Sequence, residues 1–181
     1  IVGFGVVLAG SFVTIFRIWD AVTDLGMGNI ADKTNTKYGK FTPYMLVGGI
    51  GTMIVGQIMV NLPPMLPEGT VRKTVFVLLY LLFVIFTTMQ VSGLRSTPQV
   101  CLKKGKERAT YGMINGIYLT IFYTVVNMYV YSKLMPSTKG FNLAFFKTLI
   151  TVYTIAGFIC LLIYLFFYNK YDRETSAMET T

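Results

Sequence analysis

Two carboxylates, Asp20 and Asp24, follow Arg17 and Trp19 in the first apolar region of the chain. Each residue of an α-helix turns by about 100°, so residues four apart lie within about 40° of each other on one helix face. Arg17, three residues before Asp20, falls on the same stripe. A carboxylate near the centre of a bilayer costs roughly 3 kcal/mol or more, so a partner or a cation must compensate it. The spacing predicts a coupling-ion site. The plainer alternative is a closed Arg17–Asp20 pair that only fixes helix packing.

The composition is typical of a membrane protein. Of the 181 residues, 54% are hydrophobic and 13% are charged, whereas a soluble globular protein carries about 25% charged residues. The net charge of +8 does not indicate nucleic acid binding, because the basic residues only punctuate apolar stretches. The chain has no histidine, which excludes a His-based zinc site or catalytic triad within it. Cys101 and Cys160 lack CxxC spacing and are expected to be packing residues.

Five apolar segments are long enough to cross a bilayer, which takes about 20 helical residues. We expect an all-α membrane protein of about five transmembrane helices, at residues 2–27, 44–62, 75–94, 111–131 and 145–168. Residues 1–169 would form this bundle, and residues 170–181 would form a polar, flexible cytoplasmic tail or linker. The chain opens without Met and already apolar, so we expect it to begin close to or inside a span.

Basic residues are denser in segments 28–43 and 95–110 and in the tail than in the loops between them. Because Lys and Arg favour cytoplasmic loops, these segments are predicted to be cytoplasmic. The expected setting is an integral protein of the cell membrane, with the lipid bilayer as a partner.

Small residues recur at intervals of four in two of the expected spans. Such stripes let helices approach closely in lipid, although glycine is generally frequent in membrane helices. We expect close packing at both stripes, which comprise Gly48, Thr52 and Gly56 in one span and Gly112, Gly116 and Thr120 in the other.

A short basic segment joins the first two expected spans. It should be a tight turn, in which glycines permit unusual backbone angles, an aspartate caps a helix or pairs with a lysine, and Pro43 starts the next helix. The alternative is a plain solvated loop. The residues singled out in this segment are Gly28, Asp32, Lys33, Lys37, Gly39 and Lys40.

Arg17, Trp19, Asp20 and Asp24, together with this segment up to Tyr44, closely resemble the glycoside-pentoside-hexuronide:cation symporter family, which is melibiose permease-like and belongs to the major facilitator superfamily. The resemblance implies a partial N-terminal bundle that corresponds to helices two to six of a twelve-helix transporter. Helix one and the C-terminal half would then lie outside this chain.

The resemblance also implies roles for individual residues. Asp20 and Asp24 match the acids of a shared Na⁺, Li⁺ or H⁺ site, and carboxylate oxygens suit such a hard cation. Arg17 matches a charge-balancing arginine. The segment from Gly28 to Lys40 matches a conformational-switch loop. No cofactor is implied beyond the coupling cation.

Departures from the family pattern concern the solute. Leu25 replaces a family proline, and Gln90 falls where sugar-transporting relatives place an aspartate. Near Asn115 the sugar-contacting arginine of such relatives is absent. Trp19, Gln90 and Asn115 are therefore candidates for the substrate pathway. The equal alternative for Gln90 and Asn115 is that each forms a hydrogen bond between helices.

Aromatic rings could stack on a sugar face, or simply pack or face lipid as most membrane aromatics do. The candidates are Trp19, Tyr80, Tyr118 and Tyr123. The expected function is cation-coupled symport of a sugar-like solute by alternating access. The alternative is a structural or regulatory membrane protein that uses the same fold without transporting. An intramembrane enzyme is not indicated.

Overall fold

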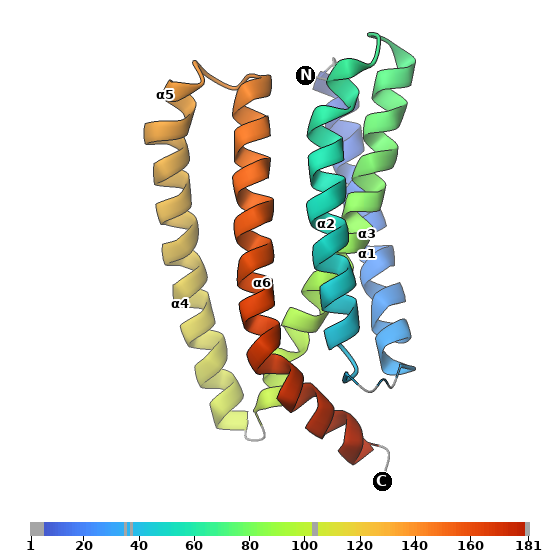
Figure 1. Cartoon of the computed structure of the whole chain (residues 1–181), viewed down its shortest axis with the longest axis vertical. Helices are drawn as coiled ribbons and strands as arrows, with labels where there is room; N and C mark the ends of the chain where they lie inside the picture. The colour runs from blue at the N-terminus through green and yellow to red at the C-terminus, as the bar shows by residue number, and fades with distance from the viewer. Residues whose placement is uncertain (1–5, 35, 37, 103–104, 180–181) are drawn as a thin grey trace.

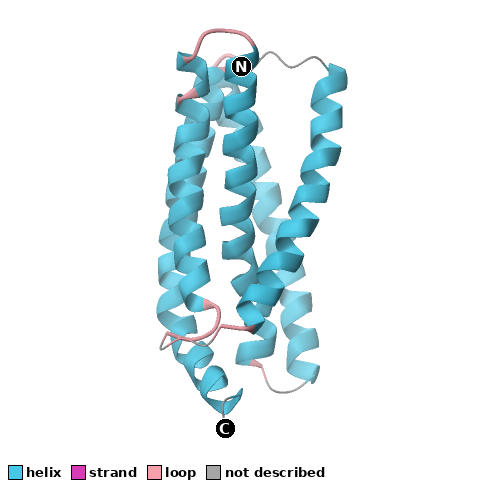
Figure 2. Cartoon of the chain, turned by 90° about the vertical axis from the view of Figure 1, so that its right-hand side faces the viewer, coloured by secondary structure: helices cyan, strands magenta, loops and turns pink. Residues whose placement is uncertain are grey.

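The computed structural model describes residues 6–34, 36, 38–102 and 105–179, and all the regular structure within these ranges is helical. The long helices run nearly parallel to one axis, as two views at right angles show (Figures 1 and 2). In chain order the elements are α1 (Val6–Asp32), α2 (Thr42–Asn61), the short η1 (Pro63–Met65), α3 (Thr70–Cys101), α4 (Gly105–Tyr129), the π-helical η2 (Val130–Leu134), α5 (Met135–Ser137) and α6 (Leu143–Glu179). The expectation of an all-α architecture is confirmed.

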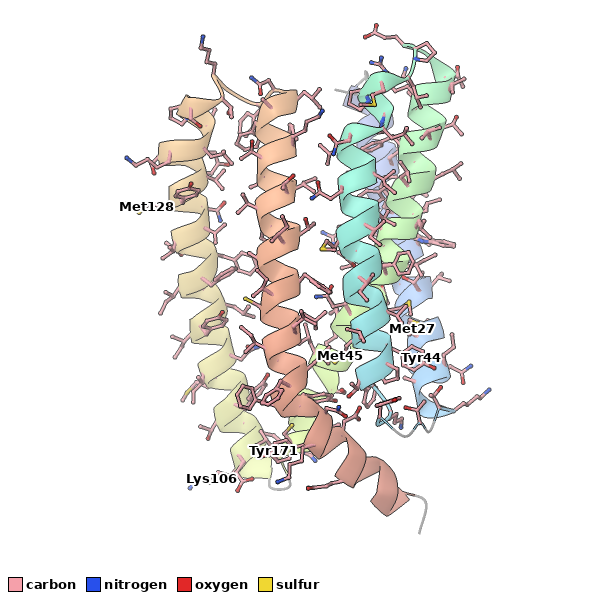
Figure 3. All side chains as sticks on the ribbon, viewed as in Figure 1. Met27, Tyr44, Met45, Lys106, Met128 and Tyr171 are labelled. Atoms are coloured by element: carbon pink, nitrogen blue, oxygen red, sulfur yellow. The ribbon has the colours of Figure 1, made fainter. Side chains whose placement is uncertain are left out.

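Helix α2 is the centre of the packing, because it contacts both α3 and α6, while α1 packs on α3. Helix α4 has no buried residue and lies on the outside, next to α6 (Figure 1). Figure 3 shows Met45 in the interior and Met128 projecting outward from α4, in agreement with exposed fractions of 0% and 71%.

The end of α1 and the start of α2, the end of α3 and the start of α4, and the C-terminal end of α6 lie at one end of the bundle (Figure 1). These are the three basic segments that were expected to share one side. Their common end is therefore confirmed, and their cytoplasmic placement stays a prediction.

Four segments of the described chain are long and apolar enough to cross a membrane: Thr42–Met65, Thr70–Ser96, Gly105–Ser137 and Leu143–Asp172. Helix α1 has 27 residues and contains Arg17, Asp20 and Asp24, but it is not among the four. The fifth expected span therefore remains a prediction.

The helices extend beyond the apolar segments from which they were predicted. Helix α1 continues to Asp32, so Gly28 lies in a helix and not in a turn. Helix α3 runs through Pro98 to Cys101. Helix α6 runs to Glu179, so the segment that was expected to be a polar tail is helical up to that residue. Hydropathy marks only the apolar length of a helix, whereas the hydrogen-bonded backbone continues through polar residues at its ends.

The two small-residue stripes have different surroundings. A Cβ on Gly48 would lie 2.5 Å from the backbone nitrogen of Gln90 and 2.7 Å from the carbonyl oxygen of Phe86, so α2 and α3 touch here through their backbones. A Cβ on Gly112 or Gly116 would meet nothing within 4 Å. Close packing is thus present at the stripe of α2, and the same expectation is wrong for α4 within this chain.

Polar side chains also join the helices. The Gln57 amide of α2 donates to the Thr154 hydroxyl of α6 at 2.8 Å and accepts from the Thr151 hydroxyl at 3.1 Å. Nearer the end with the basic connections, the hydroxyls of Ser96 and Tyr168 lie 3.0 Å apart and join α3 to α6. These bonds satisfy polar groups that the apolar surroundings could not.

We predict that Gly48→Ala destabilises the natural protein by about 1–3 kcal/mol, because backbone atoms cannot yield to the added methyl group. Gly112→Ala is the matched control, since it gains up to about 1 kcal/mol of helix propensity without a clash. Thermal unfolding in detergent measures both variants. Equal losses of stability would contradict the close approach of α2 and α3.

Candidate functional site

The face of α1 that carries the two acids packs against α3. The indole N–H of Trp19 donates to the carbonyl oxygen of Leu81 at 3.3 Å. The hydroxyls of Thr23 and Thr88 lie 3.2 Å apart. These two contacts set the register of α1 against α3. They also give Trp19 a packing role, whether or not its ring meets a solute.

A recess of about 300 Å³ opens between these two helices. Helix α1 contributes the charged pair Arg17 and Asp20, and α3 contributes Tyr80 and Thr87 among its lining residues. The Tyr80 ring also packs against Phe16, with centroids 4.2 Å apart. Arg17 and Asp20 line the same recess without forming an ion pair with each other, so the alternative of a closed Arg17–Asp20 pair is not what the structure contains.

Thr87 is a member of this recess that the sequence did not indicate. Its hydroxyl oxygen is buried and has no hydrogen-bond partner among the described residues. A buried hydroxyl without a partner loses free energy relative to one in water. Carboxylate and hydroxyl oxygens are ligands that hard cations accept. The recess lining thus includes a carboxylate residue, Asp20, and a hydroxyl residue, Thr87, whose oxygens are of the kind that a small cation accepts.

Asp24 is engaged elsewhere. Its Oδ2 accepts a hydrogen bond from Nη1 of Arg95, near the end of α3, at 2.7 Å. The two residues lie 71 positions apart in the chain, so no local pattern could have paired them. Asp24 does not line the recess that contains Asp20. The described residues also contain no group of three or more His, Cys, Asp or Glu side chains that could hold a metal ion.

The remaining pathway candidates lie apart from the recess. Gln90 is half-buried on α3, one turn beyond Thr87, where its backbone meets Gly48. Asn115 is half-buried on the outlying helix α4. Neither residue is among the recess lining. Tyr118 and Tyr123, also on α4, have exposed fractions of 60% and 53%.

The switch-like segment is shorter than its sequence suggested. Gly39 has the unusual backbone conformation that was expected of the glycines in this segment, with a left-handed φ of +100°. The N–H of Gly39 donates to the carbonyl oxygen of Thr36 at 3.0 Å. Lys33 is exposed, and the Nζ of Lys40 lies 5.6 Å from the Phe41 ring centroid. The side chain of Asp32 and all of Lys37 lie outside the described residues.

Asp172 of α6 holds this segment, which no sequence pattern indicated. Its side chain is 1% exposed. Its Oδ2 accepts from the backbone N–H groups of Phe41 and Thr42, both at 2.9 Å, and from the Thr42 hydroxyl at 2.8 Å. A carboxylate at these amides also meets the positive end of the helix dipole. Asp172 is thus the N-terminal cap of α2, supplied from a different helix.

This cap also requires Gly39, since a Cβ there would lie 2.2 Å from Oδ2 of Asp172. The charge of the same carboxylate acts on Cys101, which lies beyond the apolar part of α3. Burial, and then the charge of Asp172, raises the pKa of the Cys101 thiol. The thiol therefore stays protonated and slow to react at neutral pH.

We predict that Asp172→Asn in the natural protein, with its other cysteines replaced by serine, speeds maleimide alkylation of Cys101 by roughly three- to tenfold. Removing the charge lowers the pKa of the thiol, and weakening the cap exposes it. Glu174→Gln, an exposed acid on the same helix end, is the matched control. An unchanged rate in Asp172→Asn would show that the cap does not hold this end together.

The whole chain, residues 1–181, matches the family described as MFS/sugar transport protein. It is similar to the "Glucuronide carrier protein homolog" of Escherichia coli (strain K12), with 37% identity over 54 residues, which are 30% of this chain and 12% of that protein. It is 25% identical over 179 residues to the "Uncharacterized symporter YnaJ" of Bacillus subtilis (strain 168), which covers 96% of this chain and 37% of that protein.

A third relative is the "Putative glycoside/cation symporter YagG" of Escherichia coli (strain K12), with 34% identity over 64 residues, or 35% of this chain and 14% of that protein. The chain thus spans little more than a third of the Bacillus protein and less of the other two. No solved structure gives a significant match.

These matches confirm the resemblance to the glycoside-pentoside-hexuronide:cation symporters and the partial helix bundle that it implies. The family comprises transport proteins and not enzymes. With all of residues 1–181 matched, this chain belongs to the MFS/sugar transport protein family.

Proposed function

We propose that the natural protein containing this chain is a cation-coupled symporter of a sugar-like solute, which works by alternating access. The observation that carries the proposal is the recess between α1 and α3. Its lining includes Asp20, which carries a carboxylate, Tyr80, which carries an aromatic ring, and Thr87, whose hydroxyl oxygen is buried without a hydrogen-bond partner among the described residues. Oxygen ligands would hold Na⁺, Li⁺ or a proton, and an aromatic wall would contact a sugar ring.

The relatives support the same class of activity, since two of them are named a glucuronide carrier homolog and a glycoside/cation symporter. Alternating access requires a second helix bundle that rocks against this one. The second bundle would come from chain outside residues 1–181. Arg17 would balance the charge of the acids, and the segment from Gly28 to Lys40 would help hold the two halves together in one access state.

The test is uptake by the natural protein in proteoliposomes, with a panel of labelled glycosides and glucuronides under Na⁺, Li⁺ or proton gradients. We expect Asp20→Asn to reduce uptake to the level seen without a cation gradient, because the amide carries no charge to compensate the cation. Glu68→Gln, an exposed acid at the other end of the bundle, is the control. Unchanged cation stimulation in Asp20→Asn would refute the assignment. No saturable accumulation of any solute would favour the non-transporting alternative.

Two adjacent threonines of α3 allow a finer test. Thr87→Val removes the buried hydroxyl of a residue that lines the recess. We expect the half-saturating cation concentration to rise about fivefold or more, because the loss of one oxygen ligand costs ~1 kcal/mol. Thr88→Val removes only the hydroxyl that contacts Thr23. We expect it to lower the Tm and to leave the cation concentration dependence unchanged. The reverse pattern would place the cation elsewhere.

A further inference from the structure

We propose that Arg95 is a tethered counter-ion that occupies Asp24 and competes with the coupling cation for it. Arg95 would then set the cation affinity of the site. The inference rests on the proposed symport function and adds to it a residue that neither the sequence pattern nor the relatives assigned.

The contact between the two side chains is short and charge-assisted. Nη1 of Arg95 lies 2.7 Å from Oδ2 of Asp24, and a hydrogen bond between ionised groups is about twice as strong as a neutral one. Helical side chains point toward the N-terminus of their own helix. The guanidinium of Arg95 therefore reaches back along α3 toward the acids of α1.

The charged side chains along this part of α1 and α3 balance one another without a bound cation. The stripe on α1 carries Arg17, Asp20 and Asp24, and Arg95 adds a second positive charge from α3. Gln90, which is neutral, contributes no third carboxylate. A cation that enters this set leaves an excess positive charge. Arginine cannot relieve the excess by losing a proton, so the guanidinium must withdraw from Asp24.

The structure allows such a withdrawal. The Arg95 side chain is 65% exposed and that of Asp24 is 36% exposed, so the pair is not sealed in the interior. The backbone next to it is held, because Ser96 is buried and its hydroxyl lies 3.0 Å from that of Tyr168 on α6. Release of Asp24 is therefore a side-chain motion at a fixed helix position. A tethered cation that can leave in this way is a competitor for the free one.

The experiment uses the cation alone as the probe. The Tm of the purified natural protein in detergent is measured against NaCl, LiCl and pH series, with choline chloride holding the ionic strength constant. We expect Arg95→Gln to lower the half-saturating Na⁺ or Li⁺ concentration about fivefold, which corresponds to the energy of one partly exposed ion pair. If the coupling ion is a proton, the pH midpoint of the Tm response should rise by the equivalent of the same fivefold change in proton concentration. Arg95→Lys should stay near the wild type, because it keeps the charge.

Arg72→Gln is the matched control. It removes an arginine whose Nη1 lies 3.2 Å from the Glu68 carboxylate at the opposite end of the bundle, and it should leave the cation response unchanged. Arg95→Met keeps the apolar stem without the charge and replaces Arg95→Gln if that variant fails to fold.

The outcomes separate this inference from the function on which it rests. A cation response in the wild type with the same midpoint in Arg95→Gln, and in Arg95→Met, would overturn the tethered counter-ion and leave symport standing. A response that emerges only when Arg95 is neutralised would support the tethered counter-ion strongly. No response to Na⁺, Li⁺ or pH in the wild type or in either neutral variant would overturn both.

Discussion

Charged side chains in an apolar helix bundle must find compensation, because neither lipid nor packed side chains can solvate them. Three aspartates of the described chain meet that requirement in three different ways. Asp24 takes the guanidinium of Arg95, and Asp172 takes the backbone amides that open α2. Asp20 has neither and lines a recess with Arg17. Of these three aspartates, Asp20 is the one around which a cation site is proposed.

These compensations connect to one another through the helices. Arg95 pairs with α1, and the adjacent Ser96 contacts Tyr168 of α6. One turn further along α6, Asp172 caps α2 beside the switch-like segment. Each link is a polar contact between two different helices. Asp24 of α1 is thus linked to the start of α2 through polar contacts that involve α3 and α6.

The sequence alone was sufficient for much of this picture. Long apolar segments predicted the helices, the spacing of Asp20 and Asp24 placed them on one face, and the motif through Tyr44 indicated the family. It was less successful with the two glycine stripes, which have the same spacing. Gly48 meets the backbone of α3 while Gly112 meets open space. A stripe shows that a helix can be approached closely, and not which helix approaches it.

What the sequence by itself determined, then, was the helical, membrane-embedded character of the chain, the presence of paired acids on α1 and the basic character of one end. These depend on hydropathy and on intervals of three or four residues, which any helix converts into a common face. The tertiary structure decided the partners: Arg95 for Asp24, Thr87 beside Asp20, and Asp172 at the start of α2. These partners lie on separate helices, and only the packing of one helix on another brings them together.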